Sequence, residues 1–349
     1  MSGAALSIRS VEPRDLEDWD DLVLQCPGGT VFHRRGWLES ACRRFGHLER
    51  SLVAIDGEDE LVGVLPLAEC RSLMGARAWI SVPYAVYGGA VARTRELERA
   101  LHDAAGERAE AARVGRLELR CREDPGLDWR PSALHEGFHR ELPRDAEDVL
   151  AGMPKKARAD VRRARREHGL TLEEGRWYLP DLVRLFQRNK QDLGTPALPS
   201  GWFEDLLVSC GDETFVHVVR HGADVLAAVM SFGYGGELHA YYSGTTADAD
   251  RAYKASSFLY CALQEWAIER GYRRFDFGRS RVESGAHAFK RRQGFEPTAL
   301  GYRFLLVRDQ GLPTLNPSNP RTERIQRTWS QLPRDLATPL GGYLSRFLP

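Results

Sequence analysis

The side chains best suited to chemistry lie in the second half of the chain, around Asp276 and Lys290. Asp276 alternates with Phe275 and Phe277 on a predicted strand, so its carboxylate faces away from the two rings. Lys290 lies on a short predicted helix. A carboxylate can orient an amine, and an ammonium can stabilise the oxyanion of an acyl-transfer intermediate. The Lys290 ammonium could therefore serve acyl transfer or bind a substrate phosphate. The alternatives are an ion pair of Asp276 with a neighbouring arginine and a surface position for Lys290.

Two adjacent tyrosines, Tyr241 and Tyr242, lie on another predicted strand of the same half, residues 237–245. Neighbouring side chains on a strand face opposite sides. One ring is therefore expected in the core, whereas the other can present its hydroxyl to a substrate or leaving group and pass a proton.

Phosphate binding is predicted from a basic segment, residues 155–166, which holds seven cations and one acid. As a helix, it would place like charges one turn apart, and a bound anion would relieve their repulsion. The start of the predicted helix 255–270 adds free amide groups that favour phosphate. The alternative is a solvated basic face. The predicted phosphate-binding residues are Lys155, Lys156, Arg158, Arg162, Lys254, Ser257 and Arg279.

The composition excludes several classes of protein. The 349 residues carry 49 basic and 49 acidic side chains, so no overall charge favours nucleic acid or a membrane. The six cysteines are scattered without metal-ligand spacing, so they are expected to be reduced thiols, and no metal site is predicted. The N-terminus lacks a signal-peptide pattern, and no run approaches 18 apolar residues. These features favour a cytoplasmic protein.

The sequence predicts two similar sets of secondary-structure elements, and the second set contains these residues. Residues 53–65 and 216–229 each read as strand, glycine turn and strand, and their turn glycines, Gly57 and Gly222, lie 165 residues apart (222 − 57). Gly137 and Gly294 match again at a spacing of 157 (294 − 137). Small differences in spacing are expected from loops of different length. The sequence therefore predicts a duplicated α/β unit, in which one copy can retain the chemistry.

The predicted order of the first half is β-α-α-β-β-β-α-β, with strands that include 78–82, 86–91 and 116–120 and a helix at 95–113. This order resembles the GNAT acyltransferase fold. The expected fold is therefore α/β (α+β), with two tandem GNAT-like domains of mixed twisted sheets flanked by helices. The predicted domains are 1–150, 151–310 with the active site and a closing strand at 302–307, and a Pro-rich linker and helical tail at 311–349.

The tail at 311–349 contains a proline-rich stretch followed by apolar residues at helical spacing. Docking onto the core is the expected arrangement. The alternatives are contact with the inner face of a membrane and binding of a partner.

Acyltransferases of the GNAT type hold the coenzyme A pyrophosphate in an Arg-x-x-Gly-x-Gly/Ala loop. Here Lys254 stands where the first glycine would be. This departure disfavours coenzyme A and favours another activated acyl donor, with an acyl-coenzyme A as the alternative.

A closer resemblance rests on four segments taken together. The chain resembles the FemAB-related proteins associated with PEP-CTERM/exosortase systems. The segments are Phe275-Asp276-Phe277-Gly278-Arg279-Ser280, Ala288-Phe289-Lys290, Gln293-Gly294-Phe295-Glu296-Pro297 and Leu315-Asn316-Pro317-Ser318-Asn319-Pro320.

The resemblance implies an aminoacyltransferase or acyltransferase. FemAB proteins add amino acids from aminoacyl-tRNA to a peptidoglycan precursor, and the related branch is encoded beside exopolysaccharide genes. By position, Lys290 matches the active-site lysine of the Phe-Lys motif, and the segment from Lys155 matches a basic motif that opens the second domain. No sustained heptads predict the coiled-coil arm of some FemAB enzymes, which disfavours tRNA.

The sequence therefore predicts transfer of an acyl group to an amine of a phosphate-bearing or lipid-linked precursor of the cell envelope or exopolysaccharide. Lys290 would stabilise the oxyanion, a tyrosine would move a proton, and Asp276 would fix a cationic group. An acetyl-coenzyme A-dependent N-acetyltransferase is the close alternative. A non-catalytic scaffold for anionic polysaccharide or an assembly complex is the alternative from another class.

Overall fold

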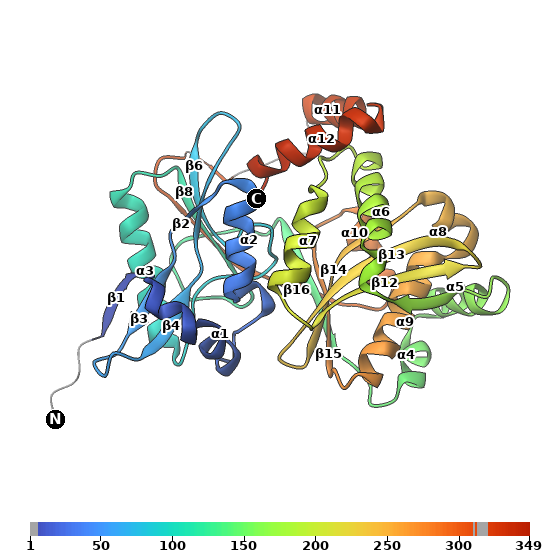
Figure 1. Cartoon of the computed structure of the whole chain (residues 1–349), viewed down its shortest axis with the longest axis horizontal. Coiled ribbons are helices and arrows are strands. Elements are labelled where there is room, and N and C mark those ends of the chain that lie inside the picture. Colours follow the sequence, from blue (N-terminus) through green and yellow to red (C-terminus); the bar gives the residue numbers. More distant parts are fainter. Residues whose placement is uncertain (1–5, 310, 313–319) are drawn as a thin grey trace. The chain divides into compact units, whose positions relative to one another are not determined.

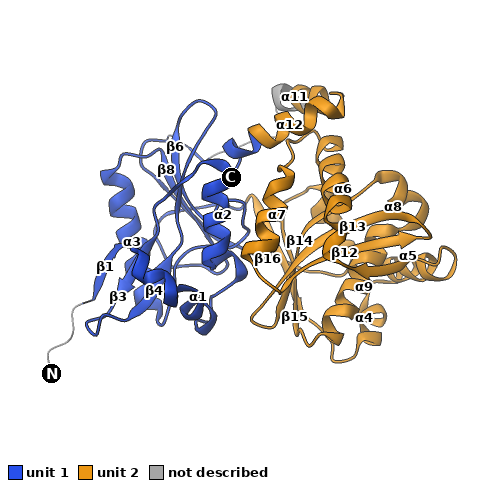
Figure 2. Ribbon diagram, in the orientation of Figure 1, with its two compact units in different colours: residues 1–133, 299–315, 344–349 blue, residues 134–298, 316–343 orange. Residues whose placement is uncertain are grey.

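The computed structural model describes residues 6–309, 311–312 and 320–349. Its contacts divide the chain into two compact units (Figures 1 and 2). Unit 1 comprises residues 1–133, 299–315 and 344–349, and unit 2 comprises residues 134–298 and 316–343. Each unit therefore contains residues from more than one of the three domains predicted from the sequence. Residues 315–319 of the Asn-Pro-rich motif lie outside the described part.

Unit 1 is a mixed α/β unit with two sheets. The six-stranded sheet has the order β2-β5-β6-β8-β17-β9, and the four-stranded sheet has the order β1-β3-β4-β7. Of the residues predicted as a strand at 86–91, residues 86–90 are irregular and only Val91 belongs to a strand, β7. The elements are β1 (Ser7–Ser10), α1 (Leu16–Gln25), α2 (Arg35–Phe45), β2 (Leu48–Glu49), β3 (Leu52–Ile55), β4 (Leu61–Leu65), β5 (Ala68–Arg71), β6 (Arg77–Ser81), β7 (Val91–Ala92), α3 (Arg95–Ala111), β8 (Arg116–Cys121), β9 (Arg130–Pro131) and β17 (Gly301–Leu306).

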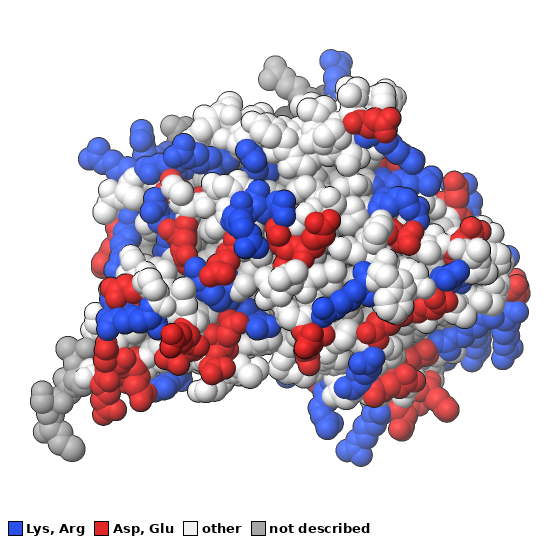
Figure 3. Space-filling model, viewed as in Figure 1, with Lys and Arg blue, Asp and Glu red and all other residues white. Residues whose placement is uncertain are grey.

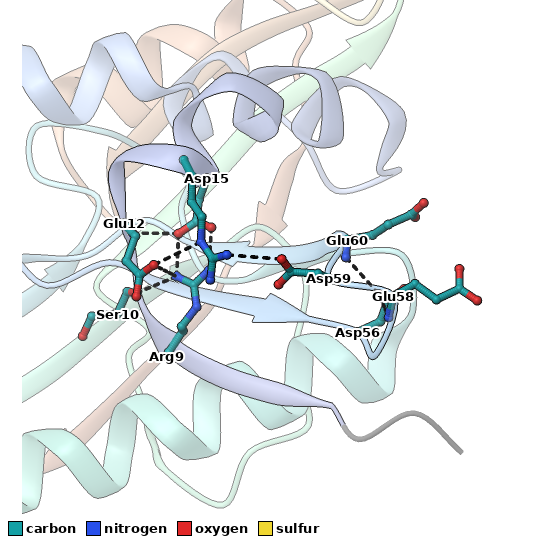
Figure 4. A network of polar contacts seen from close by, with 9 residues as sticks. Arg9, Ser10, Glu12, Asp15, Asp56, Glu58, Asp59 and Glu60 are labelled. Carbon is teal, nitrogen blue, oxygen red and sulfur yellow. Dashed lines mark hydrogen bonds and ion pairs between the residues drawn. The ribbon is translucent and has the colours of Figure 1, made fainter. Parts of the chain in front are cut away.

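An ion-pair network lies beside β1 in unit 1 (Figure 4). Both guanidinium nitrogens of Arg9 donate to Asp15 at 2.7 Å, and the Asp15 carboxylate also accepts the backbone N–H of Glu12. Burial opposes ionisation of Asp15, but these hydrogen bonds prevail and lower its pKa. The network therefore fixes the entry from β1 into the first helical turn.

Unit 2 is built on one seven-stranded sheet with the order β11-β12-β13-β14-β15-β10-β16. Helix α6 packs on β13 and β14, and α9 packs on β12 and β13, with α4 and α5 against α9. The elements are β10 (His135–Glu141), α4 (Ala146–Gly152), α5 (Lys155–Arg166), β11 (Thr171–Glu174), α6 (Leu179–Asp192), α7 (Ser200–Ser209), β12 (Thr214–His221), β13 (Asp224–Tyr234), β14 (Glu237–Thr245), α8 (Ala247–Tyr253), α9 (Ala255–Glu269), β15 (Arg274–Arg281), α10 (Gly285–Arg292), β16 (Pro297–Ala299), α11 (Pro320–Ser330) and α12 (Arg334–Leu344).

The six-stranded sheet of unit 1 and the sheet of unit 2 each contain one pair of parallel strands. In each sheet, the next strand comes from the other half of the sequence. β6 runs parallel to β8 in unit 1, and β14 runs parallel to β15 in unit 2. The strand next to β8 is β17, which comes from the end of the second half, whereas the strand next to β15 is β10, which comes from the end of the first half. The prediction that residues 302–307 close the second half was therefore wrong, because their partners lie in β8.

None of the helices in the described ranges is both long and apolar enough to span a lipid bilayer. All six cysteines are free thiols, and five of them are buried.

Candidate active site

The sheet of unit 2 opens between its two parallel strands. β14 and β15 pair only over 237–239 and 274–276, although both strands continue for several residues beyond this point. Each strand is irregular where the pairing ends. Tyr241 is an extra residue of β14 in its pairing with β13, and the ladder of β15 with β10 shifts register beside Gly278. Bulges of this kind redirect side chains and often border active sites.

The peptide of Gly278 organises this opening. Its φ of +66° is a left-handed conformation that suits glycine, and its N–H donates to Asp276 Oδ1 at 2.6 Å. Lys290 Nζ donates to the carbonyl oxygens of Gly278 and Arg279, each at 3.1 Å. A Cβ atom at Gly278 would lie 3.9 Å from Cδ2 of Tyr241. Asp276, Lys290 and Tyr241 thus meet around one glycine.

Lys290 is a buried lysine, with 8% of its surface exposed. Its ammonium lies 5.3 Å from the ring centre of Phe138 and 5.0 Å from that of Phe277. Burial lowers the pKa of Lys290 to about 7, although the charge of Asp276 raises it and that of Arg279 lowers it further. The alternative of an ordinary surface lysine was therefore wrong. Near neutral pH this amine can both donate and accept a proton.

Asp276 is 1% exposed on β15, between the buried rings of Phe275 and Phe277. Its carboxylate acts on Lys290 as the nearest favourable charge and on Gly278 through a hydrogen bond. Asp276 therefore positions both the lysine and the glycine that the lysine contacts. Arg279, on the same strand, contributes its backbone carbonyl to Lys290.

The two tyrosines have different surroundings. Tyr242 is buried, its ring packs against Phe186 and Phe203, and its hydroxyl accepts the indole N–H of Trp202 at 3.0 Å. Tyr242 is thus a core residue, which argues against the catalytic role predicted for it. Tyr241 is half-buried beside Gly278, so it is the tyrosine that the structure brings to Lys290 and Asp276.

The start of α9 was predicted to bind phosphate, but a carboxylate of the chain occupies it. Asp250 accepts the backbone N–H of Ser256 at 2.7 Å and its hydroxyl at 2.9 Å. Lys254 Nζ donates to the carbonyl of Arg251, and the Ser257 hydroxyl accepts Gln293 Nε2 at 3.1 Å. The pyrophosphate of coenzyme A fits poorly at this helix end, because the Ser256 amide and hydroxyl already donate to Asp250, whose carboxylate would repel a phosphate.

Helix α5 carries the basic segment. Its buried residues Ala157, Val161 and Ala164 belong to the core beneath α9, and the opposite side of the helix faces solvent. Basic side chains gather where α5 lies at the edge of unit 2 (Figure 3). A shallow hollow of about 450 Å³ runs along this face, and Lys156 is exposed outside it. The hollow is lined by Lys155, Arg158, Ala159, Arg162, Arg163, Arg166 and Glu167.

Unit 1 holds a counterpart of Asp276 without the lysine. The matched residue on β8 is Glu118, whose carboxylate accepts Arg120 Nε at 2.7 Å in a buried ion pair. Arg120 is further fixed by the carbonyl oxygens of Val82 and Ala85. Arg120 therefore neutralises Glu118. No described residue of unit 1 is a lysine, so the arrangement around Lys290 is found in unit 2 alone.

Sequence reasoning missed Lys190 and Asp250. Lys190 lies on α6 with its ammonium 5.3 Å from the ring centre of Phe186, and burial lowers its pKa. The i, i+4 spacing of Phe186 and Lys190 was the available signal. Asp250 gave no signal, because the cap depends on how α8 turns into α9.

Comparison with known proteins identifies a family match within unit 2. Residues 153–291 match the family described as an acetyltransferase (GNAT) domain. This segment begins just before α5 and ends one residue beyond Lys290. No curated protein matches the chain.

Three solved structures share the fold. FemX superposes with a TM-score of 0.62 at 13% identity, over 86% of this chain and 98% of FemX. A tandem GNAT protein of the clavulanic acid pathway gives 0.53 at 16%, over 89% and 100%. L-PGS from Bacillus licheniformis gives 0.54 at 13%, over 93% and 99%. The chain therefore has the tandem GNAT fold, and the family match with these neighbours supports an N-acyltransferase.

Proposed function

We propose that unit 2 transfers an acyl or aminoacyl group to an amine of a cell-envelope or exopolysaccharide precursor. The observation that carries this proposal is the buried Lys290, which lies beside Asp276 where β14 and β15 separate. A lysine with a pKa near neutrality and a specific charged neighbour is typical of a functional site.

In the proposed reaction the acceptor amine attacks the donor carbonyl, so that a C–N bond forms and the bond to the leaving group breaks. Protonated Lys290 offsets the negative charge on the carbonyl oxygen of the tetrahedral intermediate. The nitrogen loses a proton and the leaving group gains one, and we assign this transfer to the Tyr241 hydroxyl. Asp276 holds Lys290 and the Gly278 peptide in position.

The donor that best fits is an activated acyl group other than an acyl-coenzyme A, because Asp250 caps the helix end at which a pyrophosphate would bind. Aminoacyl-tRNA is a donor in the FemAB proteins that the chain resembles. An acetyl-coenzyme A-dependent N-acetyltransferase is the second candidate, and the match to an acetyltransferase domain favours it. Calorimetry with coenzyme A separates the two, since micromolar binding would support the second.

The test is a transfer assay. Nucleotide-linked and lipid-linked precursors that raise the melting temperature would first be selected, since a ligand that binds only the folded state stabilises it. Mass spectrometry would then follow acyl transfer to the selected precursor. Lys290→Met should lower the rate by about 100-fold or more. Arg291→Met, an exposed neighbour on α10, is the matched control and should stay within about twofold.

Equal rates for the wild type and Lys290→Met would refute the role of Lys290. A non-catalytic scaffold predicts a different pattern. Precursor binding would depend on cations such as Arg162, and neither the wild type nor any variant would form a transfer product.

We further propose that the C-terminal helix α12 contacts a membrane surface that carries a lipid-linked acceptor. Leu336, Leu340 and Tyr343 lie on one face of α12 and are 55%, 47% and 54% exposed. Ala337 and Gly341, on another face, are buried. An outward apolar stripe on a helix next to a basic segment (Arg324 and Arg327 on α11) suits an interfacial helix.

Flotation with phosphatidylglycerol-containing vesicles tests this contact. The full chain should float, and the double variant Leu336→Glu/Leu340→Glu should lose most of the bound fraction, because two charges would enter the apolar part of the interface. Leu73→Glu, at an exposed leucine of unit 1, is the control and should float like the wild type. Flotation of the double variant at the wild-type level would refute the contact.

A further inference from the structure

A hollow of unit 2 is lined by none of the predicted phosphate-binding residues. It measures about 570 Å³ and is bordered by α6 as far as Arg188, the turn between β12 and β13, and the start of α8. Neither the family match nor the sequence patterns assign it a ligand. Its lining residues are Tyr178, Asp181, Arg184, Leu185, Arg188, Arg220, Ala223, Asp224, Val225, Leu226, Thr246 and Ala249.

Three guanidinium groups converge on this hollow from two elements. Arg184 and Arg188 are one turn apart on α6, and Arg220 comes from β12. Arg184 pairs with Asp181 at 2.8 Å, and Arg220 lies 3.5 Å from Glu173. Arg188 has no hydrogen-bond or ion-pair partner among the residues that the structure describes. Arg188 is therefore the arginine of the hollow that lacks a partner, and the exposed carboxylate of Asp224 also lines the hollow.

Two donors of this cluster are buried without an acceptor. The Nε atoms of Arg188 and Arg220 are both shielded from solvent and lack a hydrogen-bond partner within the described chain. A buried donor without an acceptor is unfavourable. In addition, Arg184 and Arg188 repel each other, because they are two cations one turn apart on α6. A bound anion would relieve the repulsion between Arg184 and Arg188, and phosphate is the group that arginine forks bind best.

From these contacts we infer that the hollow binds the phosphate group of a ligand, with Arg188 as its main anchor. The basic face of α5 is a weaker candidate. It lies along a single helix, and its arginines Arg158, Arg163 and Arg165 already have partners in Ala151, Glu167 and Glu265. A concave site that is lined by several elements contacts a ligand from more sides than a single helix face can.

An exposed tryptophan adds a second recognition element. Trp177 is 74% exposed and directly precedes Tyr178, which lines the hollow. Its ring rests on Gly175, where a Cβ atom would lie 2.3 Å from the ring. The two aromatic rings are 5.7 Å apart. A flat face held in this way suits stacking of a ring attached to the phosphate, so a nucleotide is the ligand class that fits.

This inference rests on the proposed function only for the identity of the substrate that carries the phosphate. Thr246, which directly follows β14 and caps α8, borders the hollow, and β14 carries Tyr241. A nucleotide-linked substrate bound here would therefore contact the residue that follows this strand of the candidate active site. The binding itself is measurable without turnover.

Calorimetry on the full chain with inorganic pyrophosphate and ADP as probes tests the site. Arg188→Gln should weaken binding of both probes by about 10-fold or more, because a charge-assisted hydrogen bond is lost. Arg162→Gln, on α5, should change either affinity by less than about twofold. Trp177→Ala should weaken ADP by about fivefold or more and leave pyrophosphate unchanged.

Melting curves without ligand check that each variant is folded, and Arg188→Lys provides a charged replacement that should retain part of the affinity. Loss of binding in Arg162→Gln with normal binding in Arg188→Gln would overturn the inference, as would the absence of pyrophosphate binding by the wild type at millimolar concentration. Normal anion binding together with an inactive transfer assay would refute the proposed function and leave this site standing.

Discussion

One lysine resonance should titrate with a midpoint near pH 7 when the protein is labelled with ¹³C at the lysine ε-carbons. The chain has only five lysines, so each signal can be assigned by substitution. Burial of Lys290 lowers its pKa to about 7, and Lys290→Met should remove this resonance. Lys190 should also titrate below the usual lysine range, because desolvation of this partly buried ammonium lowers its pKa as well. A Lys290 midpoint near 10 would contradict the proposed role of the residue.

The same shift makes the stability depend on pH. Above about pH 7 folded Lys290 is neutral, whereas the unfolded chain still binds the proton up to about pH 10.5. The unfolded state therefore holds more protons in this window, so the stability of the wild type relative to Lys290→Met should rise with pH from about 7 to 10.5. The slope should approach 1.4 kcal/mol per pH unit and vanish below pH 7. Urea unfolding of both proteins at several pH values measures it.

A fragment ending at residue 150 should fail to fold. It lacks β17, so β8 loses a neighbour that pairs with it from Arg116 to Cys121. The buried side chains of Tyr302 and Phe304 leave with that strand, at about 1.5–3 kcal/mol each. Their sum is comparable to the lower end of a domain's total stability, about 5 kcal/mol. Circular dichroism and backbone amide NMR spectra would record the loss.

The control fragment restores the strand. Residues 1–133 joined through a Gly/Ser linker to residues 299–312 contain the six-stranded sheet of unit 1 in full, and this fragment should melt cooperatively. Cooperative melting of the fragment 1–150 at the same temperature would show that β17 does not support unit 1.

The local elements could be predicted because their signals lie within a few residues. The hairpins around Gly57 and Gly222, the helix at 95–113 and the strand at 237–245 follow from alternation, helical spacing and turn residues, and the structure confirms them. The strand at 302–307 was also found, but not its partner. Pairing of β17 with β8 joins residues almost 200 positions apart, and alternation within a strand contains no information about which strand lies beside it.

The candidate site was predictable in part. The resemblance indicated Lys290, the alternation with Phe275 and Phe277 indicated Asp276, and the alternation of Tyr241 with Tyr242 correctly placed one ring in the core. The burial of Lys290 could not be predicted from the sequence, because Phe138, which covers its ammonium, belongs to β10, and this strand was not predicted. The anchor Arg188 was missed for a similar reason, since its neighbour Arg220 belongs to another element.

The exchanged strands also govern how the protein can be made. Translation must pass Leu306 before β17 is available to β8, and by then every strand of unit 2 has been synthesised. The first half of a nascent polypeptide would therefore wait on the ribosome with an open sheet edge while the second half assembles, a state that invites chaperone binding. For the same reason the two halves cannot be inherited or recombined as separate modules.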